Sequence, residues 1–563
     1  MLNLNQHALI KPLRHFTLLL GLLYLYARLI ETYGGFSTEF LHLQWLEIVL
    51  VIYLYGLLYL ALRPVRWRVL LAALPVFLIY LVHDVFFLAY GKVFRFVNLS
   101  EVPELLQILP PGYAVLLVLL FAIPLVLLVR HLDYRRHRQI LAGLAPLLVL
   151  GIVLKTSPAV FASGFQSLAH EIVKYSDAKS VENNGRLAML VYREAQRTLT
   201  VDKIAPYRNR ARYDLDLQQR VTQITPHLQP RNVHLIVLES FLDPRLFREL
   251  EFSRSPVHPA FDELFGDKLG LSLAPVFGGA TAQAEFEVLC GVPAFEKLSS
   301  VEFNVFTGAP AHCLPGLLDA LAYRSVASNA YKPNFFNAQA GYTGMGFAEQ
   351  HFPMEFYSAR PGYLKFGDPG VEEYLFDANL FAQNLAFVKQ HLQQHDKPLF
   401  NYLLTIYGHT PHLLDPVQRP EIIQTHSGYP DDHLQRATNQ FYYRTQAIAE
   451  YVQQLVALDK NSLIILISDH VPPLRNGQNT FNALRYMDNR AESYYYNRIA
   501  ILENGAPVRY APLHHYDLPD LVMNYLTNGR HCAEQACAWQ DSSPRPREAY
   551  LEQYLALMAH ASE

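Results

Sequence analysis

Five apolar stretches in the first 155 residues constrain this chain more than any other feature of its sequence. They cover about residues 15–32, 45–62, 69–90, 113–130 and 139–155, and each approaches the roughly 20 residues that a helix needs to cross about 30 Å of hydrocarbon. The fifth is the shortest, and its alternative is a re-entrant segment. A cleaved signal peptide is disfavoured for the first, because no small-residue cleavage site follows it and four further stretches do. We predict an α-helical transmembrane bundle of five spans over residues 1–155.

Basic residues lie mostly on one side of these predicted spans. That side carries Lys11, Arg14, Arg63, Arg66, Arg68, Arg130, Arg135, Arg136 and Arg138, whereas the opposite loops carry Lys92 and Arg95. Loops rich in lysine and arginine stay in the cytoplasm. With five crossings of the cell (inner) membrane, everything after about residue 155 is expected to be extracytoplasmic, or periplasmic in a double-membrane envelope.

Composition supports a membrane portion joined to a separate soluble domain. The chain has 563 residues, of which 51% are hydrophobic, and a net charge of -3. That charge balance gives no reason to expect polyanion binding, and with no zinc finger or basic repeat in the sequence, nucleic acid is not an expected partner. Four cysteines are too few for a disulfide scaffold. Cys532 and Cys537 are placed to pair, Cys290 is interpreted as a packed core residue, and Cys313 stays open.

The part after the spans divides into a connector and a larger C-terminal domain. Residues 156–230 form the connector, in which Gln166 to Thr198 has helical composition; this segment either lies on the membrane surface or is a spacer helix packed on the catalytic domain. Over residues 231–563, strand-like runs alternate with helical ones, which favours a mostly parallel sheet flanked by helices. The predicted strands cover residues 233–239, 271–276, 325–330, 399–406, 462–468 and 498–503.

Apolar runs of this domain lead into residues with ligand chemistry. VHLIVLES contains Glu239, FGGATAQAEFEVLCG contains Thr281, NYLLTIYGHTPHL contains His409, and LIILISDH ends in Asp469 and His470. In an open α/β sheet, a side chain after such a run lies at the carboxyl end of a strand, where these folds bind ligands. The set predicts a metal site built around a hydroxyl nucleophile.

Each residue also has a purely structural interpretation. Glu239 is alternatively a helix N-terminal acid, Thr281 is alternatively an N-cap with Glu285 completing a capping box, and His409 and His412 are alternatively solvent-facing loop residues. The Asp469-His470 pair is the most specific, since a nonfunctional turn rarely places both ligand types after a core strand. The predicted outer location excludes ATP and other cytosolic donors, so we expect a lipid substrate.

These segments, in this order behind five apolar stretches, resemble the lipoteichoic acid synthase and phosphoglycerol transferase group of the alkaline phosphatase and sulfatase superfamily. NNGRLAMLVYREA and CLPGLLDALAYRSVASNAYKPNFFN also resemble segments of that group. The resemblance implies a sulfatase-like catalytic domain that moves a phosphoglycerol head group, or a similar phospho-alcohol, from a phospholipid donor to a glycan or polymer acceptor.

The resemblance also implies the roles of the site residues. Glu239, Thr281, Asp469 and His470 would hold a divalent metal: manganese as in the synthases, zinc as in the related phosphoethanolamine transferases, or magnesium. Thr281 would be the nucleophile that forms a phospho-threonine diester. His409 would bind phosphate or donate a proton, and His412 is a weaker candidate for substrate binding.

One segment departs from that group. Where the synthases carry Phe-Trp-Asn-Arg, this chain reads Phe335-Phe336-Asn337-Ala338, so Asn337 keeps a substrate-binding role by resemblance while the arginine is absent. The head group is then phosphoglycerol or, alternatively, phosphoethanolamine. A phosphodiesterase using the same first half-reaction and an inactive membrane-anchored sensor stay open. A sulfatase activity is set aside, because Cys313-Leu314-Pro315-Gly316 lacks the arginine of a sulfatase nucleophile motif.

Overall fold

The computed structural model describes residues 6–33, 36, 44–90, 93–172, 177–357, 362–540 and 546–563. Lys92, one of the two basic residues predicted for the outer loops, lies outside the described residues. The chain folds into two compact units, Met1–Asp202 and Lys203–Glu563. The connector predicted at 156–230 is therefore divided between the two units.

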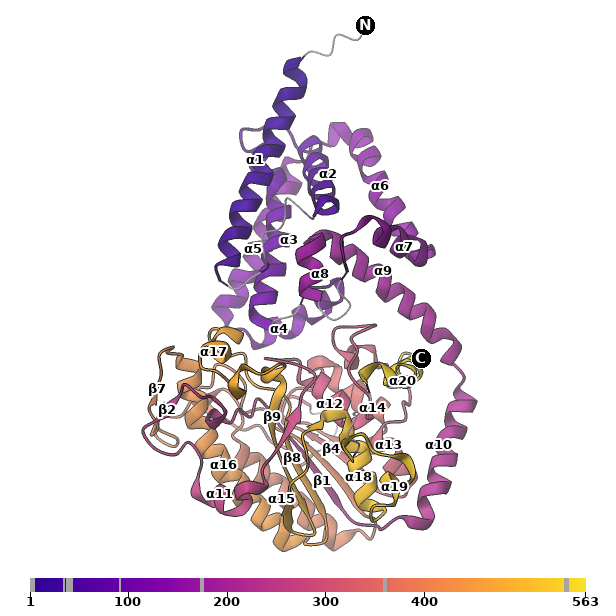
Figure 1. Ribbon diagram of the computed structural model, residues 1–563, viewed down its shortest axis with the longest axis vertical. Helices are drawn as coiled ribbons and strands as arrows, with labels where there is room; N and C mark the ends of the chain where they lie inside the picture. The colour runs from indigo at the N-terminus through magenta and orange to yellow at the C-terminus, as the bar shows by residue number, and fades with distance from the viewer. Residues whose placement is uncertain are drawn as a thin grey trace. The chain divides into compact units, whose positions relative to one another are not determined.

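The first unit is helical (Figure 1). Its helices are α1 (Gln6–Glu31), α2 (Trp45–Ala61), α3 (Arg68–Tyr90), α4 (Val102–Ile108), α5 (Pro111–His131), α6 (His137–Thr156), α7 (Pro158–Leu168), α8 (Asp177–Asn184) and α9, which runs from Arg186 to Ile204. Among the described residues, three helical segments are long and apolar enough to cross a membrane, Arg68–Leu88, Pro111–His131 and Tyr134–Thr156, and Trp45–Ala61 is apolar but shorter. Three of the predicted spans thus meet the physical requirement, and the five-span arrangement and its orientation stay predictions.

The start of α9 is fixed against the apolar helices of this unit. The backbone N–H groups of Leu187 and Ala188 donate to the carboxylate of Glu47 on α2, at 3.1 and 2.8 Å. Arg186 donates to Asp84 on α3 through Nε and Nη2, at 2.8 and 2.6 Å, and both side chains are buried. Buried carboxylates require such partners, and this end of the connector belongs to the first unit.

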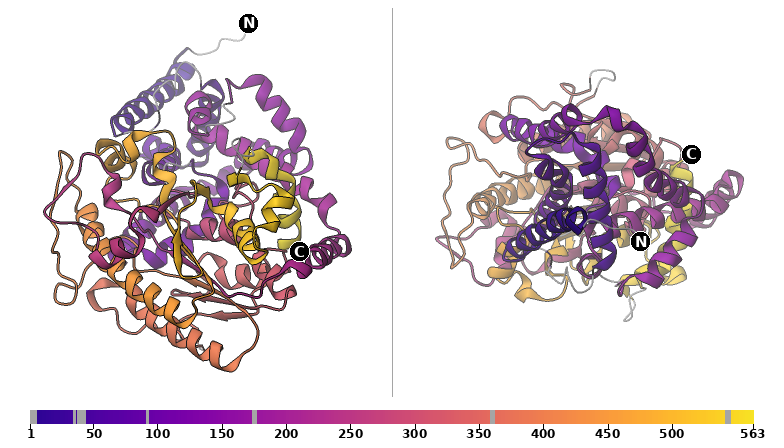
Figure 2. Two further views of the ribbon diagram at one scale, coloured as in Figure 1. Left: turned by 60° about the horizontal axis from the view of Figure 1, so that its bottom comes forward. Right: turned by 90° about the horizontal axis from the view of Figure 1, so that it is seen from above.

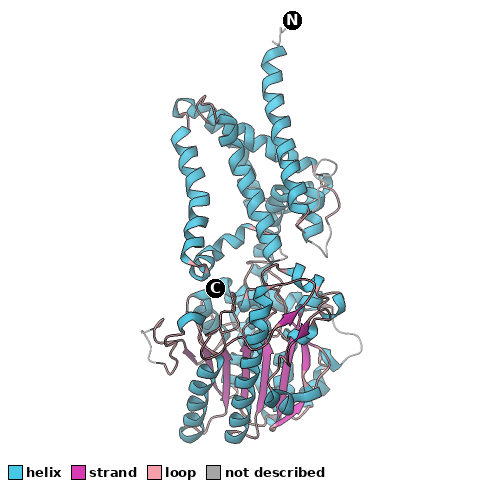
Figure 3. Ribbon diagram, turned by 90° about the vertical axis from the view of Figure 1, so that its left-hand side faces the viewer, coloured by secondary structure: helices cyan, strands magenta, loops and turns pink. Residues whose placement is uncertain are grey.

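The second unit is built on one large sheet with helices on both faces (Figures 1 and 3). The strands lie in the order β11-β3-β9-β8-β1-β6-β4-β5, with β10 paired to β9. Their bounds are β1 (Val233–Leu238), β3 (Gly270–Leu273), β4 (Arg324–Asn329), β5 (Glu349–His351), β6 (Leu399–Leu404), β8 (Leu463–Ser468), β9 (Tyr496–Glu503), β10 (Ala506–Val508) and β11 (Leu513–His514); β2 (Glu251–Phe252) and β7 (Thr425–His426) pair separately. All six predicted strands are present.

The sheet is mixed: most of its strand pairs are parallel, as predicted, and the antiparallel pairs all involve β9. Strands β8, β1, β6, β4 and β5 are parallel, but β9 runs antiparallel to both β8 and β3. A parallel return requires a crossover of a dozen or more residues, usually a helix that traverses the sheet. Between β8 and β9 the longest helix is α17 (Gln478–Ala483), of six residues. The chain therefore stays at one edge of the sheet and comes back antiparallel.

Each face of the sheet has its own hydrophobic core. Side chains such as Ile236 and Leu238 pack against helices α11 (Pro259–Phe265), α15 (Asp377–Gln394) and α16 (Asp432–Leu458), and Figure 2 shows α15 and α16 in orange along this side. Val233, Leu235 and Val237 face the opposite way. They pack in a second core with α12 (Thr281–Cys290), α13 (Leu314–Ala320), α14 (Ala338–Met345), α18 (Leu518–Leu526) and α20 (Leu551–Ala561). Leu217, Val221 and Ile224 of α10 (Arg210–Ile224) also pack against this core, and α19 (Arg530–Gln535) follows α18 in the chain.

The four cysteines form two disulfides, Cys290–Cys313 and Cys532–Cys537. The second pair was expected from its spacing. The interpretation of Cys290 as a packed core residue was incomplete: Cys290 does pack against the core, but its sulfur is bonded to Cys313 across 23 positions of sequence. This bond joins the end of α12 to the residue before α13.

Candidate metal and nucleophile site

Strand register places the two predicted carboxylates side by side. Strands β1 and β8 are parallel neighbours in which Leu238 pairs with Ser468. The next residues along the two strands, Glu239 and Asp469, therefore leave the sheet together at its carboxyl edge, followed by His470. One ligand atom from each of these three residues lies within 4.8 Å of the other two, and all three residues are buried.

Thr281 reaches this group from the start of α12. The loop before it has left-handed backbone at Gly278 and Ala280, with φ of 73° and 61°, and the Gly278 N–H donates to the carbonyl oxygen of Val471 at 3.0 Å. A non-glycine residue in this conformation stores strain that a functional site can use. The Thr281 hydroxyl donates to Glu239 Oε2 at 3.0 Å. Ala280, not Thr281, is the N-cap residue, so the capping interpretation of Thr281 was wrong.

Glu285 does not complete a capping box either. It is buried, and its Oε2 accepts hydrogen bonds from Tyr342 at 2.5 Å and from Tyr402 at 2.8 Å. Burial raises its pKa to about 8. The alternative of Glu239 as a helix N-terminal acid also fails, since β1 leads into irregular backbone and a 3-10 turn at Pro244–Leu246.

The hydrogen bonds around Asp469 engage one of its two carboxylate oxygens. Asp469 Oδ1 accepts from the backbone N–H groups of Ser240 and His470, at 2.7 and 2.6 Å. Among the described residues, no hydrogen-bond donor is recorded for Asp469 Oδ2, which lies 3.2 Å from His470 Nε2. His470 Nδ1 lies 3.0 Å from the carbonyl oxygen of Val471, a contact that favours the proton on Nδ1 and a lone pair on Nε2, the tautomer of a metal-ligating histidine.

Electrostatics also point to a cation. Burial raises the pKa of Glu239, and the nearby Asp469 charge raises it further. Burial raises the pKa of Asp469 to about 6. Two carboxylates this deeply buried are stable as anions only with a compensating charge. Two carboxylates, a hydroxyl and one imidazole form an oxygen-rich set that suits a divalent Mn²⁺ or Zn²⁺ ion.

A buried arginine holds the backbone of Glu239, which sequence reasoning did not find. Arg444 on α16 donates through Nη1 to the Glu239 carbonyl oxygen at 2.8 Å and through Nε to Asp377 Oδ2 at 2.7 Å. Thr405, directly after β6, accepts the Glu239 N–H at 2.9 Å. Gly408 lies against the same carbonyl oxygen and Arg444 Nη1, leaving no room for a Cβ atom. Arg444 lies on the buried face of α16 with Phe441 and Ile448. A charged residue at the helical spacing of buried apolar residues is the sequence signal that could have identified it.

The predicted substrate-binding residues lie in different surroundings. His409 is half-buried, its ring lies 5.0 Å from that of Tyr374, and it is close enough for its charge to lower the pKa of Glu239. His412 is buried, with Nδ1 3.2 Å from Gln440 Oε1, and burial lowers its pKa to about 3. Asn337 donates through Nδ2 to the carbonyl oxygens of Phe303 and Phe306, both at 2.8 Å. Substrate binding by these residues stays a prediction.

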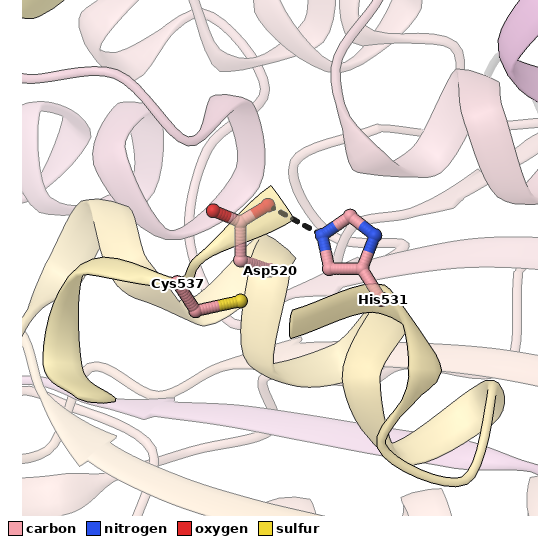
Figure 4. A group of neighbouring side chains, drawn as sticks. All are labelled: Asp520, His531 and Cys537. Carbon is pink, nitrogen blue, oxygen red and sulfur yellow. Dashed lines mark hydrogen bonds and ion pairs between the residues drawn. The ribbon is translucent and has the colours of Figure 1, made fainter. Parts of the chain in front are cut away.

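A second cluster of ligand-type side chains lies away from this site. Asp520 lies on α18, His531 lies on α19, and Cys537 follows the C-cap residue of α19 (Figure 4). Cys537 is bonded to Cys532, so its sulfur is not a thiolate in this structure.

Comparison with known proteins gives the family. A family model described as Sulfatase matches residues 231–526, more than half of the chain. The chain belongs to the sulfatase family. The resemblance of its sequence to the alkaline phosphatase and sulfatase superfamily is thereby confirmed.

Curated relatives match over part of their length. One from Rhizobium meliloti, provisionally described as a cyclic beta-1,2-glucan modification protein, is 27% identical over 44% of this chain and 37% of its own length. An uncharacterized protein from Haemophilus influenzae is 26% identical over 40% of this chain and 39% of its own. The matched regions thus span less than two fifths of either relative.

Solved structures with similar chains include a phosphoglycerol transferase and a lipoteichoic acid synthase. The Streptococcus pyogenes phosphoglycerol transferase GacH, in complex with sn-glycerol-1-phosphate, matches with 16% identity and a TM-score of 0.45, over 64% of this chain and 92% of that one. The lipoteichoic acid synthase LtaP from Listeria monocytogenes matches with 17% identity and a TM-score of 0.43, over 55% and 78%.

Proposed function

We propose that this protein is a membrane-bound phosphotransferase that moves a phosphoglycerol or similar phospho-alcohol head group from a phospholipid to an extracytoplasmic glycan or polymer. The observation that carries the proposal is the Thr281 hydroxyl, 3.0 Å from Glu239 Oε2 at the start of a helix. It lies beside two buried carboxylates and a buried imidazole, whose ligand atoms are within 4.8 Å of one another.

Glu239, Thr281, Asp469 and His470 would hold the divalent metal, with Mn²⁺ first, and Zn²⁺ or Mg²⁺ as alternatives. When bound, such an ion lowers the pKa of a coordinated hydroxyl and offsets negative charge on a phosphate. The unmatched Oδ2 of Asp469 and the tautomer of His470 are what a ligand set needs. The ten-residue helix α12 adds its own contribution, because free N–H groups and the positive end of the dipole at its start favour a phosphate oxygen.

The chain's residues support a double displacement. The Thr281 proton is directed at Glu239 Oε2, and as the Thr281 Oγ1–phosphorus bond forms, the bond to diacylglycerol breaks. His409 Nδ1 contacts the carbonyl oxygen of Thr410 at 2.8 Å, so in the doubly protonated ring Nε2–H would give its proton to the departing diacylglycerol oxygen. An acceptor hydroxyl then attacks phosphorus and passes its proton to His409 Nε2, while the threonine ester bond breaks and Thr281 takes its proton back from Glu239. This sequence of steps predicts ping-pong kinetics.

The structure bears on the head group through two residues, and a curated relative bears on the acceptor. Ala338, at the position where the synthases carry arginine, is buried in the core, and the Asn337 amide nitrogen is occupied by two carbonyl oxygens. Phosphoglycerol stays first and phosphoethanolamine second. A glycan acceptor gains support from the relative described in terms of cyclic beta-1,2-glucan.

Two disulfides support placing the second unit outside the cytoplasm, because disulfides persist in oxidising compartments. They also argue against sulfatase chemistry at Cys313, whose sulfur is already bonded to Cys290. An inactive sensor is disfavoured, since Thr281 and the three metal ligands are all present and adjacent.

The test follows both halves of the lipid. Purified full-length protein receives phosphatidylglycerol labelled in the acyl chain and in the head group, with and without cyclic β-1,2-glucan. We expect metal-dependent release of diacylglycerol and head-group transfer to glucan by the parent, but neither by Thr281→Ala. Thr222→Ala on α10, which removes a hydroxyl bonded to Gln218 at 2.8 Å, is the matched control and should match the parent. Release of free phosphoglycerol at a rate that acceptors do not alter would replace the transferase by a phosphodiesterase.

A further inference from the structure

The cluster at Asp520, His531 and Cys537 has the ingredients of a metal site apart from the proposed catalytic one. His531 Nε2 lies 2.9 Å from Asp520 Oδ1. Ligand atoms of the three residues lie within 4.8 Å of one another. Figure 4 shows the carboxylate of Asp520 facing the His531 ring with the Cys537 sulfur beside them. Cys532 supplies a further sulfur, because it is bonded to Cys537.

The cluster is held by the helices that carry it. The His531 N–H donates to Thr527 Oγ1 and the Cys532 N–H to Asn524 Oδ1, both at 3.0 Å, which ties α19 to the end of α18. His531, Cys532 and Cys537 are buried, while Asp520 is half exposed. Solvent can therefore reach the cluster on the Asp520 side.

The spacing of the two cysteines matches a zinc site. Cys532 and Cys537 are separated by four residues, which is within the two to four residues typical of zinc-binding cysteine pairs, and zinc also accepts histidine and aspartate ligands. Tetrahedral coordination with bonds of about 2.0–2.3 Å puts ligand atoms about 3.3–3.8 Å apart. The ligand atoms of Asp520, His531 and Cys537, which lie within 4.8 Å of one another, would move closer by up to about 1.5 Å, and the sulfurs of Cys532 and Cys537 would separate after reduction to about 3.8 Å.

We propose that this cluster is a redox-gated metal site. With the disulfide intact, the two sulfurs are joined and the cluster does not take a metal. When the disulfide is reduced, Cys532 and Cys537 join His531 and Asp520 as ligands of a Zn²⁺ ion, which replaces the covalent cross-link.

The exchange balances with a dithiol as reductant. The donor attacks the Cys532–Cys537 bond, supplies two electrons and two protons, and leaves as its own disulfide, so that two thiols form on the protein. Zinc binding then releases the two thiol protons to water, since the thiolate is the form that binds metal. The other disulfide, Cys290–Cys313, has no such cluster among the described residues and serves as an internal control.

The experiment compares oxidised and reduced full-length protein in detergent. One sample is treated with a phosphine reductant and desalted without oxygen, the other is left oxidised, and both are titrated with Zn²⁺ alone against a chelating dye. We expect the reduced chain to bind one equivalent more than the oxidised chain. Because the result is a difference, it does not depend on zinc bound at the proposed catalytic site.

Two further measurements locate the extra ion. Zinc should slow alkylation of Cys532 and Cys537 at least about tenfold, as followed by mass spectrometry, and leave Cys290 and Cys313 unprotected. His531→Gln should lose the extra equivalent with both thiols still present. His560→Gln is the matched control: it removes a buried histidine 3.0 Å from Glu563 and should keep the ion.

The alkylation result tests the proposal even if reduction partly unfolds the second unit, because it compares two cysteine pairs within one molecule. An equal zinc capacity in both redox states, retention of the extra ion by His531→Gln, or equal protection of both pairs would overturn the proposal.

Discussion

Arg444→Met tests the support of the proposed metal site from outside its ligand set. Arg444 and Asp377 form an ion pair in which the side chains are 2% and 0% exposed, with 2.7 Å between Nε and Oδ2. Removing one partner of such a pair leaves a buried charge without compensation, at a cost of about 3–5 kcal/mol. The variant also removes the donor to the Glu239 carbonyl oxygen. Loss of a partner that orients a ligand weakens metal binding about 10- to 100-fold.

Two readouts separate the effect on stability from the effect on the site. Urea unfolding gives the change in free energy, and titration calorimetry with Mn²⁺ gives the metal affinity. Arg248→Met is the matched control, because Arg248 pairs with Asp488 at the surface, with side chains 60% and 50% exposed. Exposed pairs contribute about 0.2–1 kcal/mol, so this variant should stay near the parent in both readouts.

The double variant Arg444→Met with Asp377→Leu completes the test. Removing both charges eliminates the buried unpaired carboxylate, so stability should recover in large part. Metal affinity should stay low, because the Glu239 carbonyl oxygen still lacks its donor. Arg444→Met with metal affinity within about twofold of the parent, or a double variant that restores the affinity, would refute the assignment of Arg444 as a positioning residue.

Three further predictions follow. Gly408→Ala should abolish metal binding and activity, because its Cβ would overlap the Glu239 carbonyl oxygen and Arg444; calorimetry that finds parental affinity would contradict this. Burial raises the pKa of Glu287 to about 8 and of Glu302 to about 7, from 4.5. Between about pH 4.5 and pH 8 the folded state then binds more protons than the unfolded state, so stability decreases as the pH rises. The urea concentration at the unfolding midpoint should therefore be lower at about pH 8 than at about pH 5, and the decrease should be smaller in Glu287→Gln; a midpoint that increases with pH would contradict this. Chelation should end lipid turnover and lower the melting temperature, and Mn²⁺ at 100 times its Kd should restore about 2.7 kcal/mol; turnover that survives chelation would exclude the metal.

The strands of the second unit that are buried on both faces could be predicted from the sequence. Residues 233–239 and 462–468 were predicted, and β1 and β8 cover Val233–Leu238 and Leu463–Ser468. Central parallel strands read as continuous apolar runs, so length and flanking polar residues reveal them. Strands β5 and β11 have three and two residues, too short to give any periodic signal. The antiparallel direction of β9 depends on how the chain between strands crosses the sheet, which residue patterns do not encode.

The ligands were visible in the sequence because each follows a core strand or opens a helix, so local pattern and spatial position coincide. The supports were not visible. Arg444 meets Asp377 over 67 positions and Glu239 over 205, and a single sequence carries no record of such pairings. The same limit applies to Cys290 and Cys313, since four cysteines allow three pairings.

The most direct test of the central claim is the mass of the Thr281 peptide after full-length protein meets phosphatidylglycerol without an acceptor and is quenched in acid. The proposal predicts a glycerophosphoryl adduct on Thr281 that a glucan acceptor removes. Lipid turnover with no adduct at Thr281, or undiminished turnover by Thr281→Ala, would contradict it.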